Sequence, residues 1–232
     1  MSNILECRGV TKSYGNHLAL DTVDLTLSGG RIVGLLGPNG SGKTTFIKLL
    51  NGLLVPNSGS LQICGEPVGQ KTKSLVSYLP DKDYLPNWMR LHQLVEMFAS
   101  FYEDFDQNCA ASMFSSLGLD PRQQLKTLSK GNREKVQLVL AMSRRAKLYL
   151  LDEPIGGVDP AARDYILRTI IQNYSEDSTV LISTHLIADV ESTLDEVVFL
   201  RQGKLILHKT IDQIREEEGK SVDTLFREVF VC

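Results

Sequence analysis

The segment 37–44, GPNGSGKT, constrains the fold of this chain more than any other stretch. It fits the pattern G-x-x-x-x-G-K-[ST], in which glycines let the backbone turn tightly enough for successive N–H groups to point at one anion. Residues 31–36 read as a buried strand, and residues 44–50 as a helix whose positive N-terminal end faces the same point. A strand, a glycine-rich loop and a helix in this order predict a site for the phosphates of a nucleoside triphosphate.

The side chains of this loop have different expected roles. Lys43 would reach the β- and γ-phosphates, and the Thr44 hydroxyl would ligate Mg²⁺. The other interpretation, an ordinary glycine-rich turn, is disfavoured by the flanking strand and helix. The residues expected to hold the nucleotide are Gly37, Pro38, Asn39, Gly40, Ser41, Gly42, Lys43, Thr44 and Thr45.

Two acids stand at the end of another predicted strand. Residues 148–154, LYLLDEP, are an apolar run that ends in Asp152 and Glu153. A strand buried on both faces can carry such residues only at its exposed carboxyl end, so Asp152 is placed to accept a Mg²⁺-bound water. Glu153, on the other side of the pleat, is a candidate to orient or deprotonate an attacking water. The alternative interpretation is a turn with solvated carboxylates.

Composition limits the classes of protein to consider. The 232 residues suit one large α/β domain, and the net charge of −3 gives no electrostatic case for nucleic-acid binding. The four cysteines are widely spaced and read as reduced intracellular thiols, not as a disulfide framework or a zinc site. No apolar run approaches the ~18 residues that span a bilayer, and the first residues lack the pattern of a signal peptide. We therefore expect a cytoplasmic chain that does not itself cross a membrane.

Hydrophobic periodicity divides the chain into three parts. The first is rich in short strands, the part from about 83 to 130 carries two helical patterns, and strands alternate with helices after Gly131. Such alternation predicts a largely parallel sheet with ligands at the carboxyl ends of its strands. The expected strands are 4–10, 20–27, 31–36, 60–64, 75–79, 147–152, 179–184 and 196–200. The expected helices are 44–50, 91–102, 107–117, 133–145, 160–173 and 186–193.

Further motifs occur in a definite order around these two sites. The sequence LSKGN at 128–132 precedes the acidic strand end by about twenty residues, and STH at 183–185 follows a later strand. The sequence GGVD occupies 156–159, Tyr14 stands at the first turn, and Pro80-Asp81 ends another strand. In order and spacing, these motifs together with the phosphate loop resemble those of the ATP-binding cassette (ABC) ATPases over nearly the whole chain.

The resemblance implies a specific fold. The whole chain, 1–232, would be one α/β domain: a P-loop NTPase core with a mixed, largely parallel sheet, an N-terminal antiparallel β-subdomain and a small α-helical insertion. The core would comprise 1–82 and 131–232. The insertion would cover about 83–130 and carry the signature loop, residues 128–132, at its end.

The resemblance also implies how ATP is held and hydrolysed. Family members form head-to-tail dimers, in which ATP on the phosphate loop of one subunit is covered by the signature loop of the other. Ser129, Lys130 and Gly131 would therefore contact the partner's nucleotide, and the loop 156–159 would cross the interface. Ser129 also fits a simpler role as the cap of the following helix.

Catalytic and metal-binding roles follow in the same way. The catalytic residues would be Lys43, Glu153 and His185. The His185 imidazole would hydrogen-bond the γ-phosphate. Without the other motifs, His185 would be interpreted as an ordinary histidine at the end of a strand. Mg²⁺ would be held by Thr44, Asp152 and Asp81. Tyr14 would stack on adenine, although an aromatic residue of a turn is an equal interpretation.

Three residues depart from the family pattern. Lys130 replaces the first glycine of the signature, which adds a cation near the expected γ-phosphate, and Asn132 replaces its glutamine. Asp81 replaces a neutral amide with a carboxylate, which puts the role of that loop in question. None of these changes removes an indispensable group.

The resemblance finally implies partners. A chain without a membrane span would work with separate transmembrane permease subunits, paired with itself or with a paralogous ATPase, at the cytoplasmic face of the cell membrane. The surface 81–89, with Tyr84, Leu85, Trp88 and Met89, is expected either to dock a helix of the membrane partner or to form the core of the insertion.

The short insertion favours an exporter of drugs, peptides or lipids over an importer. One rival is a soluble ABC ATPase that acts on ribosomes or DNA, which would usually carry two cassettes, coiled coils or basic extensions. A second rival is an inactive regulatory module. The presence of the predicted catalytic residues argues against it. The transported substrate does not follow from the sequence.

Overall fold

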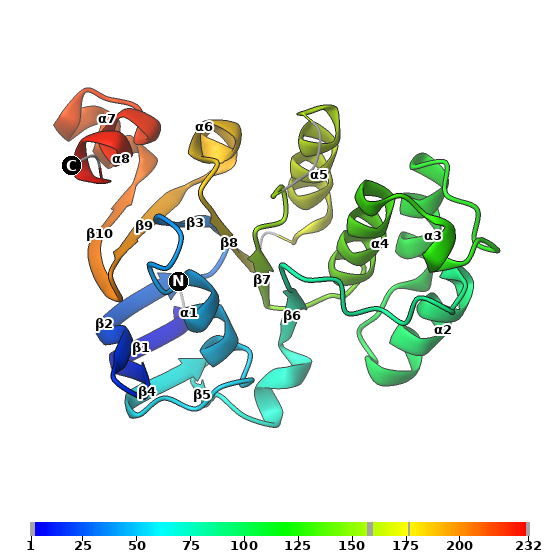
Figure 1. Ribbon diagram of the computed structural model, residues 1–232, viewed down its shortest axis with the longest axis horizontal. Helices are drawn as coiled ribbons and strands as arrows, with labels where there is room; N and C mark the ends of the chain where they lie inside the picture. Colours follow the sequence, from blue (N-terminus) through cyan, green and yellow to red (C-terminus); the bar gives the residue numbers. More distant parts are fainter. Residues whose placement is uncertain (1–2, 157–159, 176, 231–232) are drawn as a thin grey trace.

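Two sheets form the framework of the chain, and the computed structural model describes residues 3–156, 160–175 and 177–230 (Figure 1). The larger sheet has the strand order β10-β9-β3-β8-β7-β6, and every neighbouring pair except β10–β9 is parallel. Its strands are β3 (Ile32–Leu36), β6 (Val76–Leu79), β7 (Leu148–Asp152), β8 (Thr179–Thr184), β9 (Glu196–Arg201) and β10 (Lys204–Thr210). The predicted α/β class with a mixed, largely parallel sheet is confirmed.

The smaller sheet is antiparallel and lies beside the first (Figure 1). Its order is β2-β1-β4-β5, from β1 (Asn3–Tyr14), β2 (His17–Ser28), β4 (Ser58–Ile63) and β5 (Glu66–Pro67). The β1–β2 hairpin is longer than the sequence pattern indicated, because its ends alternate between half-buried and exposed residues and carry little hydrophobic signal.

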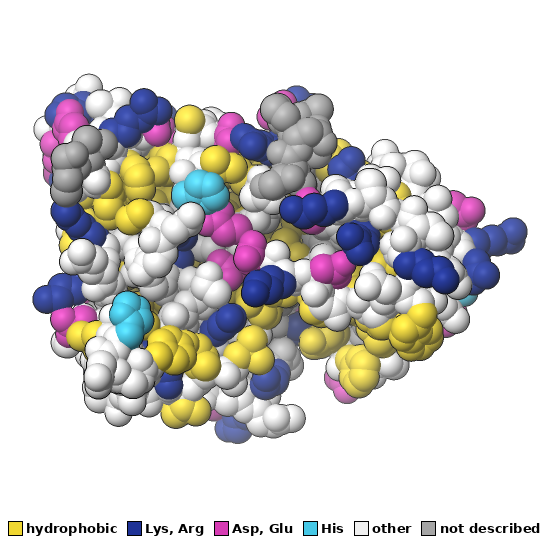
Figure 2. Space-filling view, in the orientation of Figure 1, with side chains coloured by type: hydrophobic (Ala, Val, Ile, Leu, Met, Phe, Trp, Pro, Cys, Tyr) yellow, Lys and Arg dark blue, Asp and Glu magenta, His cyan; other side chains and the backbone are white. Residues whose placement is uncertain are grey.

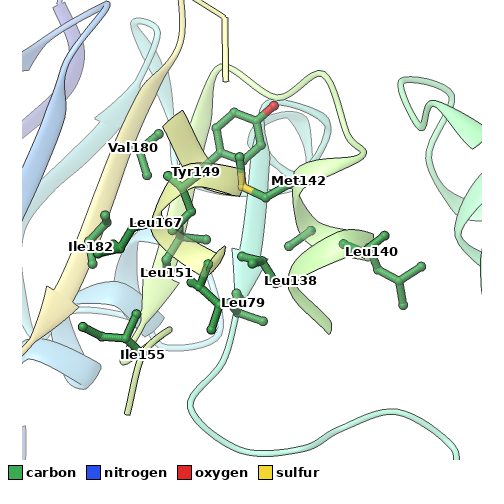
Figure 3. Packing of buried hydrophobic residues seen from close by; sticks show 14 of the residues in the cluster. Leu79, Leu138, Leu140, Met142, Tyr149, Leu151, Ile155, Leu167, Val180 and Ile182 are labelled. Atoms are coloured by element: carbon green, nitrogen blue, oxygen red, sulfur yellow. The ribbon is translucent and has the colours of Figure 1, made fainter. Parts of the chain in front are cut away.

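The central strands are buried on both faces, as their unbroken apolar runs require. Every residue of β3, β7 and β8 is buried. Alternate residues enter two cores. Leu148 and Leu150 pack with α1 (Lys43–Leu50) and the smaller sheet, whereas Tyr149 and Leu151 pack with α4 (Lys130–Met142) and α5 (Pro160–Asn173). Figure 3 shows this second core, where Leu79, Tyr149 and Leu151 meet Leu138 and Met142.

Eight helices surround the sheets in the described part of the chain. They are α1 (Lys43–Leu50), α2 (Leu91–Phe101), α3 (Gln107–Ser116), α4 (Lys130–Met142), α5 (Pro160–Asn173), α6 (Ile187–Val190), α7 (Ile211–Glu218) and α8 (Val222–Phe230). In Figure 1, α2 and α3 stand at one end of the molecule with α4 between them and the sheet. The division of the chain at 83–130 stays a prediction.

Helix α4 begins and ends three residues earlier than the predicted 133–145. Ser129 is its N-cap and accepts a hydrogen bond from the Asn132 backbone N–H at 3.3 Å. The cap satisfies a backbone donor that a later start would leave without a partner. The capping role considered for Ser129 is therefore present in the structure.

A buried arginine joins the helical end of the molecule to the sheet. Arg144 is only 4% exposed, and its guanidinium donates to both carboxylate oxygens of Asp104, at 3.0 and 3.1 Å. It also donates to the Ser74 carbonyl at 3.0 Å and lies 3.9 Å from the centre of the Tyr102 ring. Because a buried charge without its partner is strongly unfavourable, Arg144 ties the α2–α3 loop to the start of β6.

The expected aromatic surface at 84–89 exists only in part. Trp88 is 68% exposed and Tyr84 46%, but Leu85 and Met89 are buried in the core under α2 and α4. The prediction that all four lie on one surface is wrong, because the loop turns at Pro86 and the Met89 backbone bonds back to the Pro86 carbonyl. Within the described residues, every helix falls short of the length and hydropathy of a bilayer span.

Candidate functional site

The glycine-rich loop joins the carboxyl end of β3 to α1 in a path that only glycine can follow at two points. A Cβ added at Gly37 would lie 2.3 Å from the Leu200 carbonyl oxygen. Gly42 has a φ of 108°, and a Cβ there would lie 2.5 Å from the Ala19 carbonyl oxygen. No side chain caps the first turn of α1, so its N–H groups can donate to an anion.

Lys43 lies inside this loop and is 6% exposed. Its ammonium donates to the carbonyls of Gly37 at 2.7 Å and Pro38 at 3.2 Å, and lies 3.9 Å from a Glu153 carboxylate oxygen. Burial lowers the pKa of Lys43, and the carboxylate of Glu153 acts in the opposite direction. A phosphate oxygen would give this ammonium a stronger, charged acceptor than the two carbonyls.

Asp152 faces the loop from the end of β7, as predicted. Its Oδ1 accepts hydrogen bonds from the Thr44 hydroxyl at 3.2 Å and from the Ser183 hydroxyl at 2.5 Å. Its Oδ2 is buried without a partner among the described residues, and burial raises the pKa of the carboxyl group. The Asp152 carboxylate, which meets the Thr44 hydroxyl through Oδ1, supplies the hard oxygen ligands that Mg²⁺ prefers.

Glu153 and His185 form a pair on the same edge of the sheet. The His185 Nδ1 lies 3.1 Å from each Glu153 carboxylate oxygen. Glu153 has a left-handed backbone with a φ of 52°, and its N–H donates to the Ser183 carbonyl at 3.0 Å. A non-glycine residue in this conformation is strained by about 1–3 kcal/mol, and such strain is concentrated at functional sites.

Lys43, Thr44, Glu153 and His185 line one cleft of about 570 Å³, and Asp152 is connected to it through its hydrogen bond with Thr44. Figure 2 shows acidic side chains gathered beside a histidine near the middle of this face. The lining residues are Tyr14, His17, Ala19, Asn39, Gly40, Ser41, Gly42, Lys43, Thr44, Thr45, Asp81, Lys130, Glu153, Gly156 and His185. Tyr14 lies at the rim and is 48% exposed, an accessible position for a stacking partner.

The signature loop contributes one residue to this cleft. Lys130 lines it and lies 3.7 Å from the Glu134 carboxylate, whereas Ser129 and Gly131 are outside the lining. Both stand at the N-terminus of α4, where backbone N–H groups suit an anion.

Comparison with known proteins agrees with this geometry. A family model described as "ABC transporter" matches residues 20–156, which is more than half of the chain. The chain belongs to the ABC transporter family. It is therefore an ATP-binding subunit with the ATPase activity that this family couples to transport.

Two relatives and one solved structure match this ABC protein over more than nine-tenths of its length. It is 32% identical to the Nod factor export ATP-binding protein I of Cupriavidus metallidurans, over 91% of this chain and 74% of that protein. It is 30% identical to the ABC transporter ATP-binding protein YtrB of Bacillus subtilis, over 92% of this chain and 74% of that protein. A solved "ATP binding subunit of ABC transporter" superposes with a TM-score of 0.88 at 28% identity, over 97% and 99% of the two chains.

His17, Ala19 and Ser183 belong to this ABC site and were not predicted from the sequence. His17 lines the cleft, and nothing in the hairpin pattern marks it. Ser183 belongs to the motif 183–185, but its bond to Asp152 arises because β7 and β8 pair these two residues in register. The predicted interface loop, residues 156–159, lies outside the described residues except for Gly156, which lines the cleft.

Asp81 lies where its charge can influence ATP binding by this ABC protein. It lines the cleft, and its charge acts to raise the pKa of Asp152. A carboxylate here repels ATP phosphates when no metal is bound, so Asp81→Asn should strengthen metal-free ATP binding and weaken the response to Mg²⁺. The expected change is about fivefold, for a like-charge interaction of about 1 kcal/mol.

An ATP titration with and without Mg²⁺ on both proteins measures this effect. Asp212→Asn, which changes the same charge at an exposed position of α7, is the matched control and should leave both titrations unchanged. Equal metal dependence in Asp81→Asn and the unmodified protein would mean that Asp81 does not face the metal, which leaves coupling to a partner as its remaining proposed role.

Proposed function

We propose that this chain binds ATP with Mg²⁺ as one half of a head-to-tail dimer that powers separate membrane subunits of an exporter. The observation that carries the proposal is the convergence of three segments on one site: the loop 37–45, the end of β7 and the residue that follows β8. Lys43 lies 3.9 Å from Glu153, Glu153 lies 3.1 Å from His185, and Thr44 bonds Asp152 at 3.2 Å. One site thus contains a cation (Lys43), a candidate base (Glu153) with its orienting partner (His185), and an acidic metal ligand (Asp152).

The proposed roles follow from these contacts. The ATP phosphates replace the Gly37 and Pro38 carbonyl oxygens as hydrogen-bond acceptors of the Lys43 ammonium. The backbone N–H groups of residues 37–45 bind the same phosphates. Glu153 accepts a proton from the attacking water, and His185 fixes the orientation of that carboxylate. Mg²⁺, when held by Thr44 and Asp152, neutralises charge on the phosphates, with Asp81 as a further candidate ligand.

A second copy of the chain would complete each site. Ser129 and Gly131 lie outside the lining of their own cleft but expose the N-terminus of α4 on the surface. A helix N-terminus of this kind is suited to the γ-phosphate of an ATP bound to another subunit. Lys130 would then add a positive charge where the family pattern has glycine.

A groove of about 520 Å³ is the proposed site for the membrane partner. Tyr78, Pro80, Tyr84, Phe98 and Tyr102 supply its apolar lining, and lysines stand along it. Aromatic grooves of this kind bind amphipathic helices. Because β6 runs from the groove directly to Asp81, an occupant would be connected to the nucleotide cleft.

Export is proposed from one relative, whose name states that it serves Nod factor export. In this role the chain would lie on the cytoplasmic face of a membrane, held there by its permease. The rival function, action on ribosomes or DNA, finds little support in a net charge of −3. Co-purification with a permease from solubilised membranes, compared with ribosome fractions, distinguishes the two.

Mixing two inactive variants tests the head-to-tail dimer. Ser129→Arg blocks the signature loop, and Lys43→Ala disables the phosphate loop. In a mixed dimer one site carries both lesions and the other carries neither, so we expect ATP hydrolysis to return on mixing. Each variant alone at the same total concentration is the control.

Absence of recovery at every mixing ratio, with mixed dimers verified by size exclusion in ATP and Mg²⁺, would contradict catalysis by residues from two subunits. A normal hydrolysis rate for Ser129→Arg alone would contradict it as well.

A further inference from the structure

A second, much smaller cavity lies under the nucleotide cleft. Its volume is about 30 Å³, and its polar lining comes from Asp81, Glu134, Gln137, Asp152 and Glu153. It lies between the end of β6, the first turns of α4 and the acidic end of β7.

Three buried oxygens at this cavity have no hydrogen-bond partner among the described residues. They are Glu134 Oε2, Gln137 Oε1 and Asp152 Oδ2. Gln137 is 4% exposed and Asp152 is 1% exposed, so bulk water does not supply the missing bonds. Buried polar atoms are nearly always hydrogen-bonded, by protein or by ordered water. Three such atoms at one cavity therefore indicate an occupant.

The orientation of the Gln137 amide is determined by its neighbour. Its Nε2 lies 3.4 Å from a carboxylate oxygen of Asp83, which can only accept a hydrogen bond. The amide NH₂ must therefore face Asp83, and the amide oxygen is left to the cavity side. All three unpartnered atoms are then acceptors, which a hydrogen-bond donor such as water would satisfy.

The volume of the cavity suits water. A volume of about 30 Å³ is sufficient for one or two waters, each of which needs two or more polar partners. A water can donate two hydrogen bonds, and a second water can serve the remaining acceptor.

We propose that a buried water in this cavity joins Gln137 Oε1 to Asp152 Oδ2, which makes Gln137 a positioning residue for the Mg²⁺ ligand. Gln137 lies on α4, the helix that begins at the signature loop, and its NH₂ group holds Asp83, two residues beyond Asp81. The water thus connects α4 and the 81–83 loop to Asp152. This inference rests on the Mg²⁺-dependent ATP site proposed above and not on dimerisation or transport.

The test compares the Mg²⁺ dependence of ATP binding in two proteins. Gln137→Met keeps an unbranched side chain of similar length but lacks the amide. Groups that orient a metal ligand typically affect metal affinity by 10- to 100-fold, so we expect Gln137→Met to need roughly tenfold more Mg²⁺ for half-maximal binding of a fluorescent ATP analogue. Metal-free binding should change by less than about twofold, because Gln137 does not line the nucleotide cleft.

Ser143→Ala is the control for packing on the same helix. Ser143 is 1% exposed, bonds the Val139 carbonyl and lies far along α4 from the cavity. It should show the same Mg²⁺ dependence as the unmodified protein. If the unmodified protein shows no Mg²⁺-dependent ATP binding, the proposed site is wrong; if it does and Gln137→Met matches it, this inference alone is wrong.

A crystal structure of the unmodified chain at a resolution that shows ordered waters gives an independent test. We expect a water within hydrogen-bonding distance of Gln137 Oε1 and Asp152 Oδ2. A dry cavity, or one closed by side chains, would overturn the proposal whether or not the variant folds.

Discussion

Glu153→Gln is expected to slow ATP hydrolysis by roughly 10²- to 10⁴-fold while ATP binding is retained. The amide keeps the size of the carboxylate and can still contact His185, which lies 3.1 Å away, but it cannot accept a proton from water. In ATP and Mg²⁺ the variant should also elute as a stable dimer, because nucleotide that is not hydrolysed keeps the two subunits together. Steady-state hydrolysis, ATP titration and size exclusion measure the three effects.

Glu191→Gln is the matched control for this prediction. Glu191 accepts a hydrogen bond from the Val222 N–H at 2.8 Å, away from the cleft, so its substitution should leave hydrolysis unchanged. A Glu153→Gln protein that remains monomeric and hydrolyses ATP at the normal rate would exclude Glu153 as the base.

Lys43→Ala should abolish measurable hydrolysis and weaken ATP binding. Lys43 is the buried cation of the loop, and its removal leaves the phosphate charge without its main protein counter-charge. Loss of one preorganised charge-stabilising donor reduces turnover by roughly 10²-fold or more. Hydrolysis assays and ATP titrations, both at saturating Mg²⁺, test the two parts separately.

Lys48→Ala provides the comparison on the same helix. Lys48 stands in the last turn of α1 and lines the proposed partner groove, so its substitution should not alter hydrolysis by the isolated chain. Turnover near the unmodified rate in Lys43→Ala would remove the assignment of residues 37–44 as a phosphate loop.

Local patterns in the sequence were sufficient to predict the strand, loop and helix around Lys43 and the acids at the end of β7. Each of these patterns is complete within one strand or one turn, where the glycine positions, the apolar run and the terminal charges are neighbours in the chain. The order and spacing of the motifs along the chain were also sufficient to identify the family.

Contacts between distant segments were decided only by the tertiary structure. The bond from Ser183 to Asp152 depends on the pairing of β7 with β8, and the Arg144–Asp104 ion pair depends on how the helical end packs against β6. Strand β10 was not predicted, because it is a half-exposed edge strand. Helix α8 was also missed, although Leu225, Phe226 and Val229 recur at helical spacing in the sequence; the structure adds that Phe226 and Phe230 pack around Phe199.

Gln137, unlike the predicted site residues, could be recognised only from the tertiary structure. In the sequence, Gln137 is one polar residue within a helix, and only the fold places it beside Asp83 and the unpartnered oxygen of Asp152. Sequence patterns specify which faces of each element are buried. The partners across those faces depend on strand order and helix packing, which are set by the burial of all elements together and not by any one segment.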